Sequence, residues 1–192
     1  MLKLKAQLVE FQLLDEDQHK IRFRVKLRLT FANEGSEPVL LLKQQFAIGA
    51  EMLARNCEEA RIGTYLYTSR QWPSVSRAPE WARWSRKLDT ATPPVDLLFV
   101  LPPGNSVSDA LETTIYIEKA GNFDRTNKPW DEIKRTATIC LQVQVGTWPA
   151  NLEQNRNPEG PTFGQTLQQR WKSYGRLQLE RLTSEPVELS LP

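Results

Sequence analysis

Histidine is nearly absent from this chain, because His19 is the only one among 192 residues. Nucleophilic catalysis by a serine or cysteine usually needs a histidine as its base, so this chemistry has a single candidate. His19 lies in a polar stretch beside Asp15 and Asp17, where we interpret it as a solvated turn residue. One imidazole with flexible carboxylates makes a poor metal site, so we predict neither a metal nor a cofactor.

Other catalytic signatures are missing as well. The chain has no glycine-rich phosphate loop and no Cys-x-x-Cys motif, and residues 15–17 lack the glycine and distal glutamate of a calcium loop. Carboxylate pairs such as Asp131 and Glu132 receive no catalytic role from sequence alone, because acid–base chemistry depends on three-dimensional geometry. The sequence therefore favours a protein without an active site. A hydrolase whose site is not visible in the sequence stays an alternative.

Long apolar runs and a typical leader are also lacking. No run approaches the roughly 18 apolar residues of a membrane helix, and residues 1–8 show no charged head followed by an apolar stretch. If Met1 is native, we expect a cytoplasmic protein; a secreted or periplasmic protein that has lost a signal peptide is the alternative. Of the two cysteines, Cys57 lies in a polar stretch and Cys140 on the predicted outward face of a strand. We expect free thiols, with a disulfide as the alternative.

The bulk composition is that of a globular protein. Apolar residues make up 40% of the chain, and 25 basic residues against 23 acidic ones give a net charge of +2. That balance argues against a general polyanion binder, so any basic patch must be local. We predict one domain over residues 1–192, with inserted loops or helices near 76–92 and 149–175.

The clearest pattern runs from Lys20 to Phe31. Every odd position from 21 to 31 is large and apolar, while the even positions 22–28 are basic. Side chains of a strand alternate between its two faces, so this pattern predicts a half-buried strand with a core face and a cationic face. We expect Phe23, Val25 and Leu27 to be buried, and Leu141 and Val143 to join them from another strand.

Further strands and two short helices follow from the same periodicity arguments. The predicted strands cover residues 2–14, 39–42, 46–53, 62–68, 95–101, 108–119, 134–145, 177–182 and 184–191. We predict helices at 79–88 and 163–174, the second opened by a capping box of Thr162 and Gln165. Each helix has an apolar face typical of helices packed on a core. The face consists of Trp81, Trp84 and Leu88 in the first helix and of Phe163, Leu167, Trp171 and Tyr174 in the second.

Three segments together resemble an immunoglobulin-like or fibronectin-type-III-like β-sandwich. They are 29–39 (a strand with its turn), 101–104 (the turn Leu-Pro-Pro-Gly) and 184–191 (a closing strand). The resemblance implies an all-β fold, an antiparallel sandwich with two short helical insertions. It does not choose a function, because this fold carries many.

The basic row offers a first candidate surface, made of Arg24, Lys26 and Arg28. If the strand at 20–31 pairs with 108–119, Glu112 and Glu118 neutralise part of the row, which is the interpretation we favour. An anionic partner, either nucleic acid or an acidic protein surface, is the alternative.

Loop tryptophans offer a second candidate surface. Trp72, Trp130 and Trp148 each lie beside a proline in polar stretches, where no strand or helix period demands an apolar residue. We therefore predict exposed indoles available for contact. The function we predict is a protein-interaction or assembly module with a protein partner, in which oligomers are possible and nucleic acid is not favoured. Carbohydrate or ligand binding through these tryptophans is the alternative.

Overall fold

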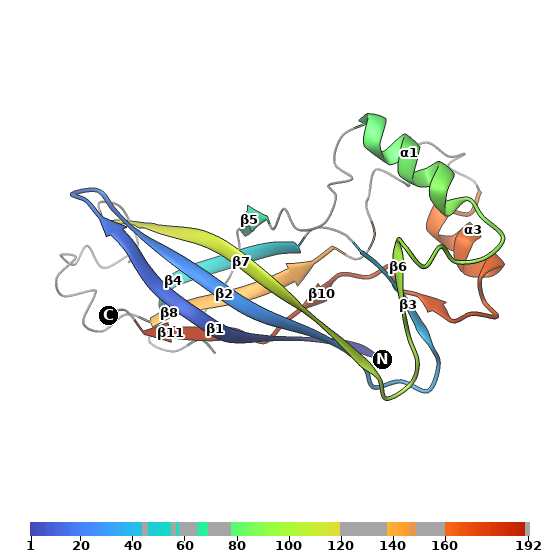
Figure 1. Cartoon of the computed structure of the whole chain (residues 1–192), viewed down its shortest axis with the longest axis horizontal. Coiled ribbons are helices and arrows are strands. Elements are labelled where there is room, and N and C mark those ends of the chain that lie inside the picture. The colour runs from blue at the N-terminus through green and yellow to red at the C-terminus, as the bar shows by residue number, and fades with distance from the viewer. Residues whose placement is uncertain are drawn as a thin grey trace.

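The computed structural model describes residues 1–43, 46–54, 57, 65–68, 78–119, 138–146, 148 and 160–190, and its elements are drawn in Figure 1. The described part is mostly β, as the sequence predicts. Its strands are β1 (Leu2–Glu16), β2 (Lys20–Asn33), β3 (Val39–Leu42), β4 (Phe46–Ala54), β5 (Tyr65–Thr68), β6 (Leu98–Leu101), β7 (Ser106–Glu118), β8 (Thr138–Val145), β9 (Arg176–Leu177), β10 (Leu182–Thr183) and β11 (Val187–Ser190). The helices are α1 (Ala78–Leu88) and α3 (Phe163–Arg170).

The strands form three sheets. The first sheet has the order β1-β2-β7 and the second has the order β10-β8-β4-β5 with β11 also paired to β8. The small sheet has the order β6-β3-β9, in which β3 and β9 are parallel. The predicted pairing of the basic strand with the segment at 108–119 is confirmed, because β2 and β7 run antiparallel with Lys26 opposite Glu112.

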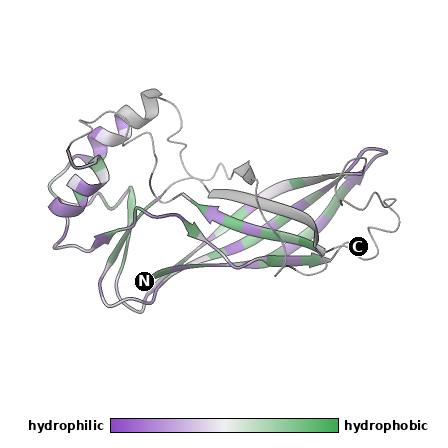
Figure 2. Cartoon of the chain, turned by 180° about the vertical axis from the view of Figure 1, so that it is seen from behind, coloured by the Kyte–Doolittle hydropathy of each residue, from purple (hydrophilic) through white to green (hydrophobic). Residues whose placement is uncertain are grey.

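The main core is one buried cluster that receives side chains from the first and second sheets. The odd residues of β2 point into it, and Phe23 and Val25 are fully buried. Leu141 and Val143 of β8 are fully buried on the other side, so the predicted core residues are confirmed. The alternation of hydrophobic and hydrophilic residues along the strands is visible in Figure 2.

A second apolar cluster lies at the opposite end of the molecule from the β1–β2 turn. This helical cluster consists of Leu40, Leu42, Trp84, Leu88, Leu97, Leu98, Phe163, Leu167, Trp171 and Leu177. The strand β3 connects the two cores, because Val39 and Leu41 face the main core while Leu40 and Leu42 face the helical cluster. All four are buried, which explains the unbroken apolar run that the sequence shows there.

The helix α3 begins as predicted and ends earlier than predicted. The Thr162 hydroxyl accepts a hydrogen bond from the Gln165 amide, and the Gln165 side chain accepts one from the Thr162 amide. The helix stops at Arg170. Tyr174, predicted to lie on its buried face, therefore lies beyond the helix and is 45% exposed, whereas Trp171 is fully buried.

The cysteines correct the expectation of free thiols. Cys57 and Cys140 form a disulfide, and the Cys140 side chain is fully buried rather than outward and accessible. Alternation along β8 places Cys140 on the face away from Ile139 and Leu141, but the neighbouring strands β4 and β11 flank it on both sides. A strand in the middle of a sheet has another strand on each side. Alternation in the sequence does not reveal whether a strand holds that central position.

Candidate protein-interaction edge

The first strand of the chain forms one edge of the first sheet. β1 is 15 residues long and pairs with β2 on one side only; in the described part of the chain, no strand pairs with its other edge. The strands β10 and β11 of the second sheet approach β1 without pairing with it. Backbone amides and carbonyls along an unpaired edge can pair with another strand. Figure 1 shows this long blue strand on the side of β2 that faces away from β7.

Two β-bulges interrupt the pairing of β1 with β2. Leu8 lies opposite Leu27 and Glu10 opposite Lys26, so Val9 is an extra residue between them. The same irregularity recurs at Leu14, between the residues opposite Phe23 and Arg22. A bulge adds one residue and shifts the alternation of all that follow. This shift explains why the sequence of residues 2–14 alternates imperfectly.

Apolar side chains gather along this edge. Among the residues that the structure describes, eight large apolar side chains are exposed, and half of them belong to β1. Val9 is 57% exposed and Leu13 is 44% exposed, while Leu8 and Leu14 are each 39% exposed. Single exposed apolar residues are common on surfaces, but several of them on one edge strand favour an interaction site.

The exposure of Leu8 and Leu13 is unexpected for their face. Each lies opposite a residue of the main core, Leu8 opposite Leu27 and Leu13 opposite Phe23. Those two neighbours are at most 1% exposed. Leu8 and Leu13 face inward like their neighbours on β2, but on β1, one strand closer to the edge of the sheet, they are only partly covered. The first sheet has an apolar inner face that extends to its free edge, where an additional strand would cover it.

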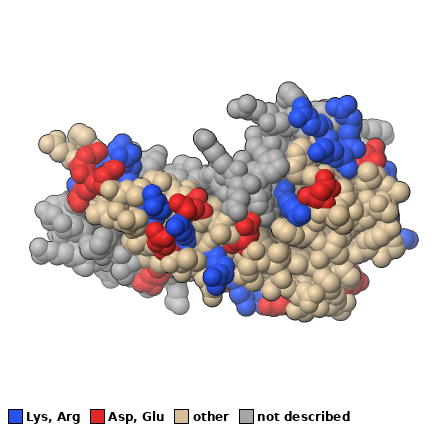
Figure 3. Space-filling view, viewed as in Figure 1, with Lys and Arg blue, Asp and Glu red and all other residues tan. Residues whose placement is uncertain are grey.

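The outer face of the first sheet carries the basic row, and most of it is paired. Arg24 Nε lies 3.6 Å from Glu112 Oε1, and Lys26 Nζ lies 2.7 Å from Glu10 Oε2 and 3.8 Å from Glu112 Oε2. The hydrogen bond from Lys26 lowers the pKa of the Glu10 carboxyl, and the same bond raises the pKa of Lys26. Figure 3 shows the resulting mixture of basic and acidic side chains over this face.

Arg28 differs from its neighbours in the row. It is exposed and lies opposite Ala110, and within the described ranges no carboxylate pairs with it. A shallow hollow of about 540 Å³ surrounds this position, with Val9, Lys26 and Glu112 among its lining residues. Neutralisation by Glu112 is therefore confirmed for Arg24 and Lys26 but does not extend to Arg28. The side chain of Glu118, the other predicted partner, lies outside the description.

Of the three predicted contact tryptophans, the structure describes only Trp148. Trp72 and Trp130 lie outside the described residues. Trp148 is half-buried against the helical cluster, with its ring centre 6.1 Å from that of Phe163. A partner-binding role for these three residues stays a prediction, but the position of Trp148 is that of a packing residue.

Two other hollows lie toward the helical end. The larger, about 720 Å³, has Lys172, Arg176, Leu177 and Leu179 among its lining residues. The smaller, about 320 Å³, is lined in part by Trp84 and Phe99. Lys43 also lines that hollow, and its Nζ lies 4.8 Å from the Phe99 ring centre and donates to the Val95 carbonyl at 3.1 Å.

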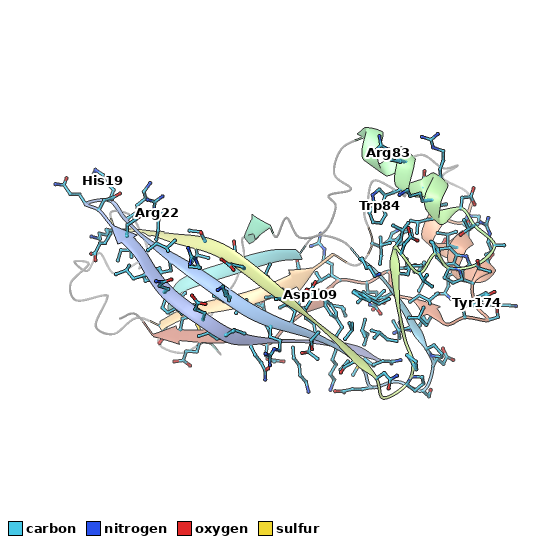
Figure 4. The ribbon with its side chains drawn as sticks, viewed as in Figure 1. His19, Arg22, Arg83, Trp84, Asp109 and Tyr174 are labelled. Carbon is cyan, nitrogen blue, oxygen red and sulfur yellow. A yellow bond between two sulfur atoms is a disulfide. The ribbon has the colours of Figure 1, made fainter. Side chains whose placement is uncertain are left out.

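His19 lies at the tip of the β1–β2 turn, far from the aromatic residues of the helical end, as Figure 4 shows. Its side chain is exposed, in agreement with a solvated turn residue. The turn is held by Asp17, whose Oδ1 accepts from the amides of His19 and Lys20 at 2.7 and 2.8 Å. These backbone hydrogen bonds lower the pKa of Asp17. Among the described residues, no group of three or more His, Cys, Asp and Glu is arranged to hold a metal ion.

Comparison with known proteins adds no identification: no family model, no curated protein and no solved structure matches this chain. In the described part of the chain, neither helix has the length and apolar character that crossing a membrane requires.

The free edge of β1 was not predicted from the sequence, because the sequence of a single strand does not directly show its position within a sheet. One signal was present. The alternation of residues 2–14 breaks at Val9 and Leu14, and a break in period two within a strand indicates a bulge. Bulges occur preferentially at sheet edges, so the break points to an edge strand.

Proposed function

We propose that this protein is a non-catalytic protein-interaction module that binds an extended segment of a partner along the free edge of β1. The observation that carries this proposal is that an unpaired strand edge coincides with inward-facing side chains that remain exposed. Leu8 and Leu13 are 39% and 44% exposed although their neighbours on β2 belong to the main core.

Strand addition satisfies both features at once. The backbone of an incoming strand pairs with the edge amides and carbonyls of β1, and its alternate side chains lie over the apolar inner face. Covering one half-exposed leucine contributes about 1 kcal/mol from apolar burial. Phe11, which stacks on Phe23 with ring centres 4.7 Å apart, lies between Leu8 and Leu13 and extends the same apolar surface.

The two bulges favour a specific partner over general stickiness. Bulges at Val9 and Leu14 interrupt the regular edge, and natural proteins use such irregularities to discourage indiscriminate pairing. A partner strand must therefore match short regular stretches between the bulges. A side chain that enters the hollow beside Val9 and Arg28 would add selectivity on the outer face.

The scaffold that we propose for this edge is an immunoglobulin-like sandwich. One buried cluster contains side chains of the first sheet, such as Leu27 and Leu111, and of the second, such as Leu141 and Leu189. This shared core and the antiparallel pairing of β2 with β7 support two layers packed face to face.

We also propose an oxidising environment for the protein. The disulfide between Cys57 and Cys140 uses both cysteines of the chain, and disulfides persist mainly outside the cytosol. It favours the secreted or periplasmic alternative over the cytoplasmic expectation.

A photo-crosslinking experiment tests the β1 proposal. A photoreactive residue placed at Val9 or Leu13 is expected to capture a partner under native conditions, whereas the same residue at Val95 is not. Val95 is a matched control because it is apolar and 74% exposed but lies outside β1.

Substitution provides the second half of the test. Val9→Lys and Leu13→Lys place a charge on the proposed interface and are expected to reduce capture at least about tenfold, a loss of about 1.4 kcal/mol. Val95→Lys is expected to leave capture unchanged. Equal capture by all three variants, or loss with Val95→Lys alone, would contradict the proposal.

A further inference from the structure

Charges are distributed unequally along β1. Its basic residues, Lys3 and Lys5, lie in the first third of the strand, and its acidic residues, Glu10, Asp15 and Glu16, lie beyond the middle. When two copies of such a strand pair antiparallel, the basic part of one lies against the acidic part of the other. β1 is therefore complementary in charge to itself.

The bulge at Val9 also lets side chains of the two halves of β1 point to the same face when the halves of two copies lie opposite each other. Before it, even-numbered residues such as Leu4 point inward; after it, odd-numbered residues such as Phe11 do so. Residues opposite each other in a pair of strands must share a face. Pairing Lys5 with Glu10 of a second copy sets two outward residues together, and Leu4 then lies opposite Phe11.

A second register, with Lys3 opposite Asp15 of the other copy, also joins opposite charges. Both of those charges already have partners, because Lys3 Nζ lies 2.6 Å from Glu34 Oε2 and Asp15 Oδ1 accepts from Arg22 Nε at 2.7 Å. The register with Lys5 opposite Glu10 leaves these pairs intact, and it places Leu2 opposite Leu13, both of which point inward. It thereby covers one of the exposed leucines of the free edge.

The charges themselves leave room for this contact. Lys5 is exposed, and it acts on the Glu34 carboxyl only at longer range, without a direct ion pair or side-chain hydrogen bond to any described residue. Glu10 accepts from Lys26 through Oε2 alone. The other carboxylate oxygen, Oε1, accepts no hydrogen bond from any described residue. A second cation can therefore join Glu10 without displacing Lys26.

We propose that the strand bound along β1 is β1 of a second copy of this chain, paired antiparallel across a two-fold axis with Lys5 opposite Glu10. This inference rests on the proposed strand-binding function of β1. The two-fold axis repeats every contact, so the dimer contains the Lys5–Glu10 pair twice. The interface is a continuous sheet that runs from β7 of one copy to β7 of the other.

Charge reversal in separate copies tests the register. Lys5→Glu alone and Glu10→Lys alone each place like charges at both contacts, so each variant is expected to dimerise at least tenfold more weakly than the wild type. Mixed one to one, they place opposite charges at both contacts, and the heterodimer is expected to recover wild-type affinity. Sedimentation velocity over a concentration series measures all three samples.

Two controls keep the result interpretable. Lys172→Glu reverses an exposed charge at the helical end and is expected to leave dimerisation unchanged. Should Glu10→Lys fail to fold after losing its bond to Lys26, copies carrying Lys5→Cys and Glu10→Cys are mixed under oxidising conditions. The expected product is a disulfide between residue 5 of one copy and residue 10 of the other.

The outcomes separate this inference from the proposed function. A wild-type protein that stays monomeric at its highest soluble concentration overturns the dimer. The dimer is also overturned if two results are found together: the mixed charge-reversal variants form no heterodimer, and the mixed cysteine variants form no intermolecular disulfide. If the protein is monomeric and a photoreactive residue at Leu13 still captures another protein, strand binding holds and only the second copy is wrong. If neither dimer nor capture is found, both fail.

Discussion

Cys57 is joined to Cys140 by a disulfide that spans 83 residues of sequence and anchors the segment after β4 to a strand at the centre of the second sheet. Cys140 is fully buried there. In the chain-entropy account, a cross-link that closes a loop of this length removes freedom from the unfolded chain and stabilises the folded state by about 4.5 kcal/mol.

Removal of the disulfide is the first prediction. The double variant Cys57→Ala with Cys140→Ala is expected to lower the free energy of unfolding by about 2–5 kcal/mol. Urea denaturation of the variant and of the wild type with and without reductant measures the effect. Two thiols titrated in the unreduced, unfolded wild type would show that the disulfide does not form.

The main core gives a second prediction with an internal control. Leu27 and Leu141 are at most 1% exposed, so truncation of either to Ala is expected to cost about 2–5 kcal/mol through lost burial and cavity formation. Leu13→Ala removes the same atoms from a residue that is 44% exposed, and we expect a loss below about 1 kcal/mol. Similar losses at Leu13 and Leu27, measured by urea denaturation, would contradict the placement of the free edge.

The contrast between these leucines shows what sequence could and could not supply. Alternation predicted the buried face of β2, because a strand that is covered on one face alternates apolar and polar residues along its own sequence. It could not predict that Leu13 is exposed, because exposure depends on whether a further strand lies beside β1. The pairing of Cys57 with Cys140 and the contact of Trp148 with Phe163 were hidden for the same reason, since both join distant segments.

Trp148 provides the third prediction. The sequence predicts an exposed contact residue, whereas the structure places the indole half-buried beside Phe163. We therefore expect Trp148→Ala to lower the free energy of unfolding by about 2 kcal/mol, less than the loss of about 3–5 kcal/mol for the fully buried Trp171. Thermal or urea denaturation of both variants gives the comparison. A stable Trp148→Ala variant with weakened partner capture would restore the contact role.

Acid sensitivity is the fourth prediction. Hydrogen bonds from backbone amides lower the pKa of Asp17, and a hydrogen bond from Lys3 lowers that of Glu34. A carboxyl whose pKa is lower in the folded state contributes stability above its unfolded pKa and loses it as pH falls through the folded pKa. We therefore expect stability to fall between about pH 5 and about pH 2.

The variant Asp17→Asn isolates one of these groups, because the amide oxygen keeps an acceptor but loses the charge. The wild type is expected to be more stable than Asp17→Asn near neutral pH. That difference should vanish once Asp17 is protonated in both states. Urea denaturation of both proteins at several pH values measures it, and a difference independent of pH would mean that ionised Asp17 contributes nothing.

The basic row supports the last prediction, which separates strand binding from recognition of an anionic partner. Arg24 and Lys26 already pair with Glu112, and exposed pairs of this kind contribute only about 0–1 kcal/mol each. Strand binding at β1 depends mainly on the edge backbone and the inner face, and its proposed outer-face ion pair uses Glu10 and none of these three cations. The triple change of Arg24, Lys26 and Arg28 to Gln is therefore expected to leave partner capture nearly unchanged. An anionic partner would depend on the same cations, and its affinity would fall steeply with added salt. Capture measured at two salt concentrations distinguishes them. If the triple variant loses capture and the wild type loses it with salt, Arg28 and its hollow become the binding site instead of the edge of β1.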